Sequence, residues 1–502
     1  MFERHSIRSR YSMRATAVSL LSAAAVAISG AAPATSYAAD GSAAAGAAQV
    51  SAFGADASAA ITRAASLRTV KVASVAALVK ALAEAMPGDR IALADGSYVL
   101  GSDIKVTRSG TAENPVVIAA ENVGRVFLKG AGTFDIEANH LVVEGFNFTN
   151  GATLEVPAIR HHVRVTRNVF QMPSTVKNWV SIAGDDCEID HNVFQKKKTE
   201  GVFLQITGPG TADMAKRTHI HHNQFKEHTF GGANGGESIR LGLSMRQHGQ
   251  AAALVEDNLF DKANGDPEAI SVKSSGNLIR HNTIRNSRGT ITLRHGWNNT
   301  VDGNMIIGGS SGIRVFGNGH VVINNVVQNS SAAPLLEIGS GDIRDDSKNL
   351  NVHEAADHVL VAFNTFVGSG LSANVLRVGD AKEKFTPDDI TFANNILSGN
   401  VRVEKSTNLT WNGNIITTKS TAVPTLGYRV ANPQLLLVDG LYRLSATSPA
   451  FGTAVGSYSK VRTDIDGQAR PQTRSSVGAD EVVVGGVNRV PAVSTVVGPT
   501  AP

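Results

Sequence analysis

Residues 254–296 read LVEDNLFDKANGDPEAISVKSSGNLIRHNTIRNSRGTITLRHG and contain the pattern that decides the fold. Two of its segments, LVEDNLF and LIRHNTI, share one motif: an alternating stretch, an asparagine, and then two mostly apolar residues. Between and after them, AISVKS and TITLRH alternate apolar and polar residues with the period of two that is typical of a β-strand. The stretch therefore predicts short strands that recur with an asparagine at a fixed place in each repeat.

The asparagine motif recurs along most of the chain, at intervals of 19 to 39 residues. Intervals that rarely fall below about 20 residues, with longer excursions, are typical of a solenoid with loops inserted at some turns. Asparagine tolerates left-handed backbone geometry and bonds to neighbouring amides, so stacked copies can form a ladder at one corner of each coil. The predicted ladder contains Asn147, Asn168, Asn192, Asn223, Asn258, Asn282, Asn304, Asn325, Asn364, Asn395 and Asn414.

These repeats, together with 49 glycines and few aromatic residues, predict an all-β fold. We expect a single-domain, right-handed parallel β-helix over residues 70–485. A β-sandwich does not produce such an asparagine period, and propeller blades have a longer repeat. The segment SVAALVKALAEAMPGD, residues 74–89, predicts a short helix with Ser74 as its N-cap. That helix would cover the open N-terminal end of the solenoid, whose edge would otherwise invite aggregation.

The first 38 residues have the features of a secretory signal peptide. Four arginines precede an apolar run at residues 15–28, and Ser36-Tyr37-Ala38 supplies a small-x-small cleavage site. The alternative is a membrane anchor, but the run is short and rich in alanine for one. Residues 39–69 are rich in Ala, Gly and Ser and predict a flexible linker, and residues 486–502 predict a C-terminal tail. We expect export to the periplasm or the medium.

The charge of the exported chain is close to zero. The full sequence has 47 Lys and Arg against 43 Asp and Glu, and removing four arginines and one glutamate with the signal leaves 43 against 42. So balanced a chain gives little support to nucleic-acid binding. No later segment is apolar enough to span a membrane, and the single cysteine, Cys187, excludes an intrachain disulfide. We expect a monomer that holds any polyanionic partner by a local group of cations.

Four strand-like segments each turn one cation outward: Arg240, Lys273, Arg294 and Arg314. In each segment two alternating apolar residues point inward, and the intervals between the cations are 33, 21 and 20 residues. If each interval is one coil, the four cations form one row on an outer face. Strands in a sheet lie ~4.8 Å apart, so Lys273 and Arg294 would reach the same sugar of a bound chain. The row predicts a linear acidic polysaccharide as the partner.

Lysine beside arginine suits the β-elimination of a uronic-acid chain. The reaction needs a base for the C-5 proton, neutralisation of the adjacent carboxylate, and an acid for the leaving 4-oxygen. Neighbouring positive charge lowers the pKa of a lysine, as a lysine base requires. Asn234, Asp266 and Glu268 bring oxygen atoms to a shared edge and suit a calcium ion. The alternative is that the two carboxylates only pair with the cations.

Five motifs spread over residues 70–480 carry a resemblance to a known family: PGDRIALADGSY, NGGESIRLG, EAISVKS, RHG and VGADE. With them the chain resembles polysaccharide lyase family 6, which includes alginate lyases and chondroitinase B. The resemblance implies that Lys273 is the Brønsted base and Arg294 the Brønsted acid. Because the pKa of arginine is very high, Arg294 can instead stabilise charge while a water delivers the proton.

The same resemblance assigns further roles. It implies that Arg240, His295 and Arg314 contact the substrate. It also implies a calcium ion bound by Asn234, Asp266 and Glu268; Asp266 is a departure, because the family usually has a longer glutamate there. We therefore expect alginate as the substrate, since most of the resembling family acts on it.

Other interpretations are a dermatan sulfate lyase, a uronan C-5 epimerase and a non-catalytic β-helical adhesin or glycan-binding protein. The epimerase lacks support because no DPHD-type motif is present, and an adhesin would not need a Lys/Arg pair at coil spacing. The block preference and endo or exo action are not readable from the sequence.

Two histidine groups invite a metal hypothesis. Alternation places His219 and His221 on one face of a strand and His222 on the other, so we interpret this group as packing or surface residues. His161 and His162 are placed in a similar way at the start of a strand.

Overall fold

The computed structural model describes residues 68–172, 177–332, 334–345, 349–418, 423–424 and 426–502. All of them belong to one compact unit, residues 57–502. The predicted signal peptide and almost all of the predicted linker lie outside the described residues. Among the described residues, no helix has the length and apolar character needed to cross a membrane.

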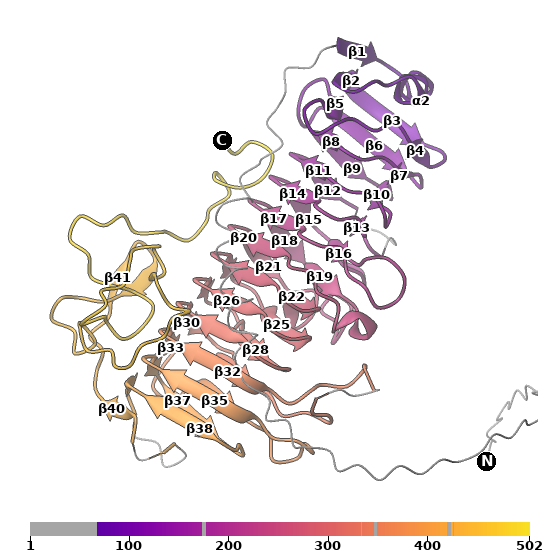
Figure 1. Cartoon of the computed structure of the whole chain (residues 1–502). Helices are drawn as coiled ribbons and strands as arrows, with labels where there is room; N and C mark the ends of the chain where they lie inside the picture. Colours follow the sequence, from indigo (N-terminus) through magenta and orange to yellow (C-terminus); the bar gives the residue numbers. More distant parts are fainter. Residues whose placement is uncertain (1–67, 173–176, 333, 346–348, 419–422, 425) are drawn as a thin grey trace, which may run out of the picture. The chain divides into compact units, whose positions relative to one another are not determined.

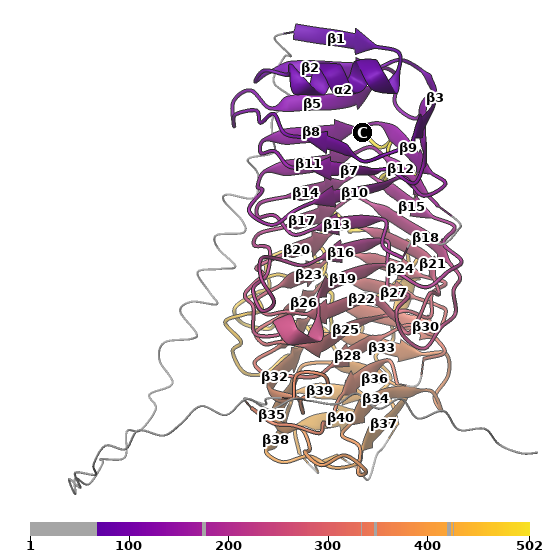
Figure 2. The same cartoon turned by 90° about the vertical axis from the view of Figure 1, so that its right-hand side faces the viewer.

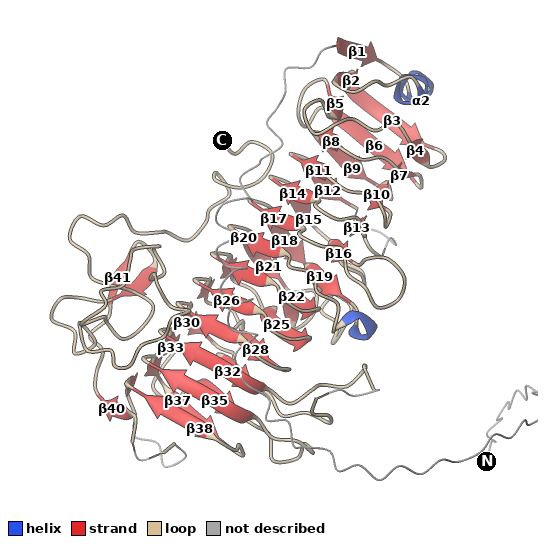
Figure 3. Cartoon of the chain, viewed as in Figure 1, coloured by secondary structure: helices blue, strands red, loops and turns tan. Residues whose placement is uncertain are grey.

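Three long parallel sheets, here called A, B and C, build the fold, and most coils add one strand to each sheet (Figures 1 and 3). This arrangement confirms the predicted parallel β-helix. Sheet A contains β1 (Arg68–Val72), β2 (Asp89–Leu93), β5 (Val116–Ala120), β8 (Leu141–Glu144), β11 (Val163–Thr166), β14 (Glu188–Asp190), β17 (His219–His221), β20 (Leu254–Glu256), β23 (Leu278–Arg280), β26 (Thr300–Asp302), β29 (Val321–Ile323), β32 (Asp357–Ala362), β35 (Asp388–Ala393) and β38 (Leu409–Asn412). Sheet B contains β3 (Gly96–Leu100), β6 (Val126–Gly130), β9 (Phe146–Thr149), β12 (Val169–Gln171), β15 (Val193–Gln195), β18 (Gln224–His228), β21 (Leu259–Ala263), β24 (Thr283–Arg285), β27 (Met305–Ile307), β30 (Val326–Ser330), β33 (Thr365–Gly368), β36 (Ile396–Ser398), β39 (Asn414–Ile416) and β40 (Tyr428–Val430). Sheet C contains β4 (Ile104–Val106), β7 (Thr133–Ile136), β10 (Thr153–Val156), β13 (Val180–Ile182), β16 (Leu204–Ile206), β19 (Ile239–Gly242), β22 (Glu268–Lys273), β25 (Thr290–His295), β28 (Ile313–Val315), β31 (Leu336–Ile338), β34 (Asn374–Val378) and β37 (Asn400–Val403).

The predicted N-terminal helix is present as α2 (Val75–Ala83). Ser74 caps it, because its side-chain oxygen accepts a hydrogen bond from the backbone N–H of Ala77 at 3.1 Å. The apolar face of α2 buries Leu78 and Leu82 in the main core, and Figure 2 shows the helix beside β2 at the N-terminal end of the solenoid. The helix thus covers the first coil as expected.

The corner between sheets A and B holds the asparagine ladder. From Asn168 to Asn414, the side-chain oxygen of each asparagine accepts the backbone N–H of its counterpart in the preceding coil or, at the first rung, that of Phe146. The prediction fails for Asn147, because Phe146 occupies the ladder position and Asn147 lies one residue further, in β9. The left-handed residue is also the one before each ladder asparagine, such as His191 with φ +52°, and not the asparagine.

The interior of the solenoid is apolar and regularly stacked. Five phenylalanines of sheet B lie one above another, with successive ring centroids 4.7–4.9 Å apart: Phe148, Phe170, Phe194, Phe225 and Phe260. This distance matches the strand spacing, so each ring packs on its counterpart in the next coil. The inward residues that the sequence predicted for the cation-bearing strands are fully buried, with Ile270 and Val272 as examples.

After β40 the chain forms a small antiparallel hairpin, β41 (Leu436–Val438) and β42 (Leu441–Arg443), and then a polar closing segment. In that segment the buried Arg470 donates hydrogen bonds to Glu481 at 2.8 Å and to Asn324 at 2.9 Å. The hydrogen bond to Asn324 ties the closing segment to the solenoid.

The residues predicted as a tail, 486–502, have neither helix nor strand but follow the ladder corner back along the solenoid (Figure 1, yellow). Arg489 pairs with Asp257 at 2.9 Å, the N–H of Gly498 bonds to the carbonyl of His222, and Arg167 donates to the carbonyl of Pro499. The predicted tail is therefore attached along the solenoid by these contacts.

Candidate active site

The predicted cations lie on the outer face of sheet C, on β19, β22, β25 and β28. They do not form one row. Arg240 pairs with Ser271, Ser271 with Thr292 and Thr292 with Arg314, so the two outer arginines share a row whose middle members are hydroxyl residues. Lys273 lies two residues beyond Ser271, on the same face but in a second row.

A β-bulge explains where Arg294 lies. Val272 pairs with Leu293, but Lys273 pairs with His295, so Arg294 is the extra residue on β25. A bulge re-aims the side chains beside it and is frequent next to active sites. The sequence intervals between the cations cannot reveal this shift, because inserted loops and the bulge change the count.

Glu237 lies two residues before the start of β19 and connects the two rows. It is fully buried, accepts two hydrogen bonds from Arg240 at 2.9 and 2.5 Å, and lies 3.4 Å from the Nζ atom of Lys273. Burial by itself raises the pKa of Glu237, but Arg240 and the charge of Lys273 outweigh burial and lower it. Glu237 thus holds Arg240 in place and also contacts Lys273.

Lys273 is the least exposed of the four cations, at 7%. Burial lowers the pKa of its amine; Arg240 and Arg294 lower it further, and Glu237 and Glu268 act against them. Burial, and not the neighbouring cations that the sequence predicted, is the main cause of this lowering. A lysine in this setting has a larger neutral fraction near neutral pH, as a general base requires.

Arg294 is partly exposed, and its Nη1 atom donates a hydrogen bond to Glu268 Oε1 at 2.7 Å. Glu268 itself is buried. Both oxygens of Asp266 accept backbone N–H groups, from Gly236 and from Glu268, each at 2.7 Å. Burial, and after it the charge of Glu237, raises the pKa of Asp266 to about 6. The charged form of Asp266 is therefore disfavoured, mainly by burial.

Two of the three predicted calcium ligands, Asp266 and Glu268, are buried carboxylates. Glu268 Oε2 is buried and has no hydrogen-bond partner among the described residues, and the raised pKa of Asp266 shows that its charge is poorly compensated. Asn234 is exposed on the loop before β19. Hard oxygen donors with uncompensated charge fit a calcium ion. Glu268 also forms an ion pair with Arg294. The alternative prediction, that the carboxylates pair with the cations, therefore holds, among the described residues, for Glu268 but not for Asp266.

His295 ends β25 and is almost fully buried. Burial, helped by His353, Arg294 and Lys273, lowers its pKa to about 3, so its ring is neutral at physiological pH. Its Nε2 atom lies 3.3 Å from the hydroxyl of Ser244. A neutral imidazole can donate a hydrogen bond to a substrate carboxylate but adds no charge.

Sequence reasoning missed His353. This residue lies in the long insertion between β31 and β32, and its ring stacks on Phe316 with centroids 4.2 Å apart and lies 5.9 Å from His295. Phe316 in turn contacts Arg314, whose guanidinium lies 5.3 Å from the ring centre and donates to Glu337 at 2.9 Å. The only sequence signal was the length of the 39-residue interval that contains the insertion.

Unsatisfied polar atoms gather on these strands. Among the described residues, five buried polar atoms of this face have no hydrogen-bond partner: Ser238 Oγ, Ser271 Oγ, Glu268 Oε2, Arg294 Nε and His295 Nδ1. Buried polar groups in folded proteins are nearly always paired, so a concentration of unpaired ones on one face indicates a site that binds a polar ligand. The face combines these groups with four cations.

Comparison with known proteins agrees with this geometry. The family model described as Chondroitinase B matches residues 72–432. The chain belongs to this family, polysaccharide lyase family 6. No curated protein matches the chain.

Among solved structures of family 6, a PL6 family alginate lyase, AlyGC, is 26% identical, with a TM-score of 0.65 over 79% of this chain and 60% of that one. A point mutant of AlyGC gives a TM-score of 0.66 and 26% identity over 76% and 55%. This chain thus spans little more than half the length of AlyGC. A mannuronic acid specific family 6 lyase from human gut microbiota is 24% identical, with a TM-score of 0.63 over 73% and 91%, which supports the fold alone.

Proposed function

We propose that the protein is an exported polysaccharide lyase that cleaves alginate by β-elimination on the outer face of sheet C. The observation that carries the proposal is the placement of Lys273: a nearly buried amine with a lowered pKa, 3.4 Å from Glu237 and one strand from Arg294. Family membership and the likeness to AlyGC support the reaction class.

In this proposal neutral Lys273 takes the C-5 proton of a uronate residue. The electron pair of the broken C–H bond forms the C-4=C-5 double bond, the bond from C-4 to the glycosidic oxygen breaks, and that oxygen takes up a proton. Arg294 stabilises the developing negative charge on the leaving oxygen, and a water delivers the proton. The products are a shortened chain and a chain that begins with an unsaturated uronate.

The substrate carboxylate must be neutralised before its neighbouring carbon can lose a proton. Arg240, held by Glu237, and Arg314, held by Glu337, supply fixed positive charges, and His295 supplies a hydrogen-bond donor. Asn234, Asp266 and Glu268 would hold a calcium ion, which when bound adds positive charge beside the carboxylate. Fixed charges in a partly desolvated site stabilise such a charge more strongly than water does.

Dermatan sulfate is the second candidate substrate. It is favoured by one observation, the description of the matching family model as Chondroitinase B. Both polymers contain uronate residues and would use the same base, so the proposed chemistry does not distinguish them.

The test is to incubate the purified exported chain with alginate and, separately, with dermatan sulfate, and to follow the ultraviolet absorbance of the unsaturated product. We expect a rise with alginate that Lys273→Ala abolishes, while Lys105→Ala, a change at an exposed lysine of the same sheet, leaves it intact. A rise with dermatan sulfate alone would assign the second substrate. Binding of either polymer without a rise, by a folded protein, would instead favour a glycan-binding protein.

Export has a separate test. Expression of the full chain in a Gram-negative host is expected to give a periplasmic or secreted protein whose N-terminus follows Ala38. Retention of residues 1–38 in a membrane fraction would favour the membrane-anchor alternative.

A further inference from the structure

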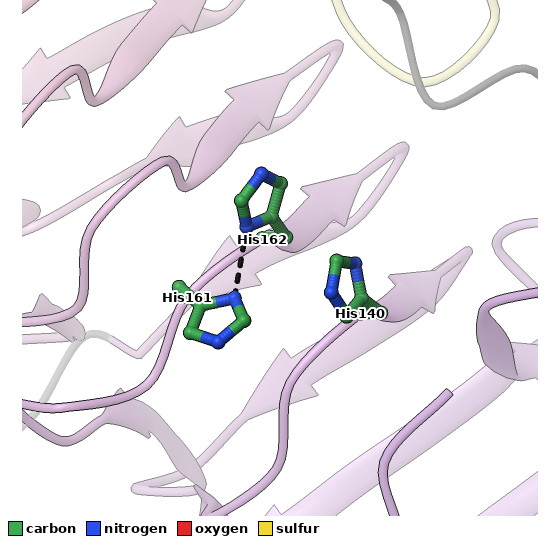
Figure 4. A group of neighbouring side chains, drawn as sticks. All are labelled: His140, His161 and His162. Atoms are coloured by element: carbon green, nitrogen blue, oxygen red, sulfur yellow. Dashed lines mark hydrogen bonds between the residues drawn. The ribbon is translucent and has the colours of Figure 1, made fainter. Parts of the chain in front are cut away.

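Three histidines lie together outside the candidate active site (Figure 4). His140 directly precedes β8, and His161 and His162 directly precede β11, the next strand of sheet A. The group therefore joins two consecutive coils at the N-terminal ends of their sheet A strands. The candidate active site lies on sheet C, several coils further along the chain.

The ring nitrogens of these histidines converge. His161 Nδ1 and His162 Nδ1 are 2.9 Å apart, and the ring of His140 stacks on that of His162 with centroids 4.7 Å apart. One nitrogen from each of the three rings lies within 4.8 Å of the other two. All three residues are half-buried, so solvent reaches the group.

The backbone fixes two of the rings in equivalent places. His140 and His162 both adopt left-handed conformations, with φ of +51° and +56°. The carbonyl of His162 accepts the N–H of Leu141, and the carbonyl of His161 accepts the N–H of His140, so the two corners stack in register. A left-handed conformation is uncommon for residues other than glycine, and here it is repeated in successive coils.

This group differs from the three others in which His, Asp or Glu side chains converge. In the group with His221, the carboxylates of Glu188 and Asp190 lie within ion-pair distance of Arg164. In the group with His281, Glu256 pairs with Arg280 and Asp257 with Arg489. In the group with Asp464, both Asp466 and Asp480 pair with Arg443. Those groups are internal ion-pair networks. In the described part of the chain, the rings of the histidine group show no bond to an acid or to an arginine.

We propose that His140, His161 and His162 bind a divalent transition-metal ion of the zinc class, with water completing a tetrahedral shell. Imidazole nitrogens are preferred ligands of such ions, and three histidines with one open position are a known zinc arrangement. Zinc–nitrogen bonds of ~2.0–2.1 Å at tetrahedral angles separate two ligand nitrogens by about 3.4 Å. The 2.9 Å pair therefore has to open by about half an ångström, which a small rotation of either ring provides.

A bound ion would tie the connection before β8 to the connection before β11. It would act as a staple near the N-terminal end of the solenoid, apart from the chemistry proposed on sheet C. The inference does not depend on the proposed lyase activity.

The test is calorimetric titration of the metal-free chain with zinc chloride, for the wild type and for His140→Asn and His162→Asn. Asparagine is chosen because it tolerates the left-handed conformation of both sites. The matched control is His358→Asn, an exposed histidine with φ +53° in β32 that pairs with Asp389 instead of with other histidines. His161→Gln adds a variant without a left-handed constraint, and thermal unfolding checks that each variant folds.

We expect one equivalent of zinc to bind the wild type and the control, with an affinity at least ~10-fold lower in each of the three variants, since each loses one of three protein ligands. Zinc should also raise the unfolding temperature of the wild type but not that of His140→Asn. Absence of binding at one equivalent would show that the histidines form only a hydrogen-bonded pair and a stacked ring. Binding that persists unchanged in the variants would place the ion elsewhere, and either result overturns the proposal.

Discussion

Two regions of each coil contrast in how they treat polar groups. At the corner between sheets A and B, the amide of Asn282 makes five hydrogen bonds, to its neighbours in the ladder and to the carbonyls of Val255 and Arg280. On the outer face of sheet C, Ser271, Glu268 and His295 keep buried polar atoms without partners among the described residues. The same backbone thus carries one fully bonded column and one incompletely bonded face.

The contrast separates stability from binding. A buried polar group gains little net free energy when it is bonded but costs about 1–3 kcal/mol when it is not, so the ladder avoids a penalty that the sheet C face accepts. A face with unpaired groups and desolvated charges is costly for folding and suitable for a polyanionic ligand. Changes at the two regions should therefore affect different properties.

Among variants that keep Lys273, Arg294→Ala should have the largest effect on activity. Removal of a preorganised charge beside a developing oxyanion lowers kcat by about 10²–10³-fold. The control is Arg402→Ala, an exposed arginine of β37 on the same sheet, which should leave the rate of unsaturated-product formation unchanged. Equal loss in both variants would mean that bulk positive charge, and not the placement of Arg294, drives the reaction.

Asn282→Ala should destabilise the fold without altering the chemistry. It leaves the buried N–H of Asn258 without its partner and removes a bond to the carbonyl of Val255, and we expect a loss of about 3 kcal/mol in the free energy of unfolding. Urea unfolding measures this, with activity assayed well below the transition. Asn400→Ala, which removes one exposed bond to Asn374, should cost less than about 1 kcal/mol. Similar midpoints for the two variants would contradict a stabilising role for the ladder.

Glu237→Gln should move the pH dependence of the reaction. The charge of Glu237 raises the pKa of Lys273, so its removal lowers that pKa further. A lysine base acts when neutral, and the rise of kcat with pH should therefore shift to lower pH. Glu337→Gln, which disturbs Arg314 and Arg377 instead, should leave the rise in place. A shift to higher pH in Glu237→Gln would show that this lysine is not the titrating base.

The smallest expected effect is that of added calcium on the unfolding temperature. Binding to the folded state alone raises the unfolding temperature, and we expect a rise of about 2 °C for the wild type at saturating calcium. Asp266→Asn, which removes one of the three proposed ligands, should abolish the rise, and chelation with EDTA should reverse it in the wild type. A rise that survives Asp266→Asn would place the ion elsewhere.

The sequence predicted the fold well because the asparagine corner is a local device that repeats in every coil. It could not place Asn147, since Phe146 takes the ladder position there, nor show that the residue before each ladder asparagine is left-handed. The segment 486–502 was predicted as a tail because its contacts, such as Arg489 with Asp257, join residues far apart in sequence.

The sequence predicted that the four cations lie on one outer face, but not how they are arranged on it. Lys273 and Arg294 follow from strand alternation and family resemblance. The separation of Lys273 from the row of Arg240 and Arg314 depends on strand register, and the place of Arg294 depends on a β-bulge. Intervals between residues reveal neither. The position of His353 beside His295 likewise depends on how a long insertion folds back.

The most direct test is to measure activity and stability together for Lys273→Met. Methionine keeps most of the length of the side chain but removes a buried charge, and Glu237 retains both bonds to Arg240. We predict that formation of unsaturated product falls by at least ~10³-fold. The free energy of unfolding should stay equal or rise, because a desolvated ammonium is lost. Retained activity, or a loss of stability as large as that of Asn282→Ala, would contradict the separation of the two regions.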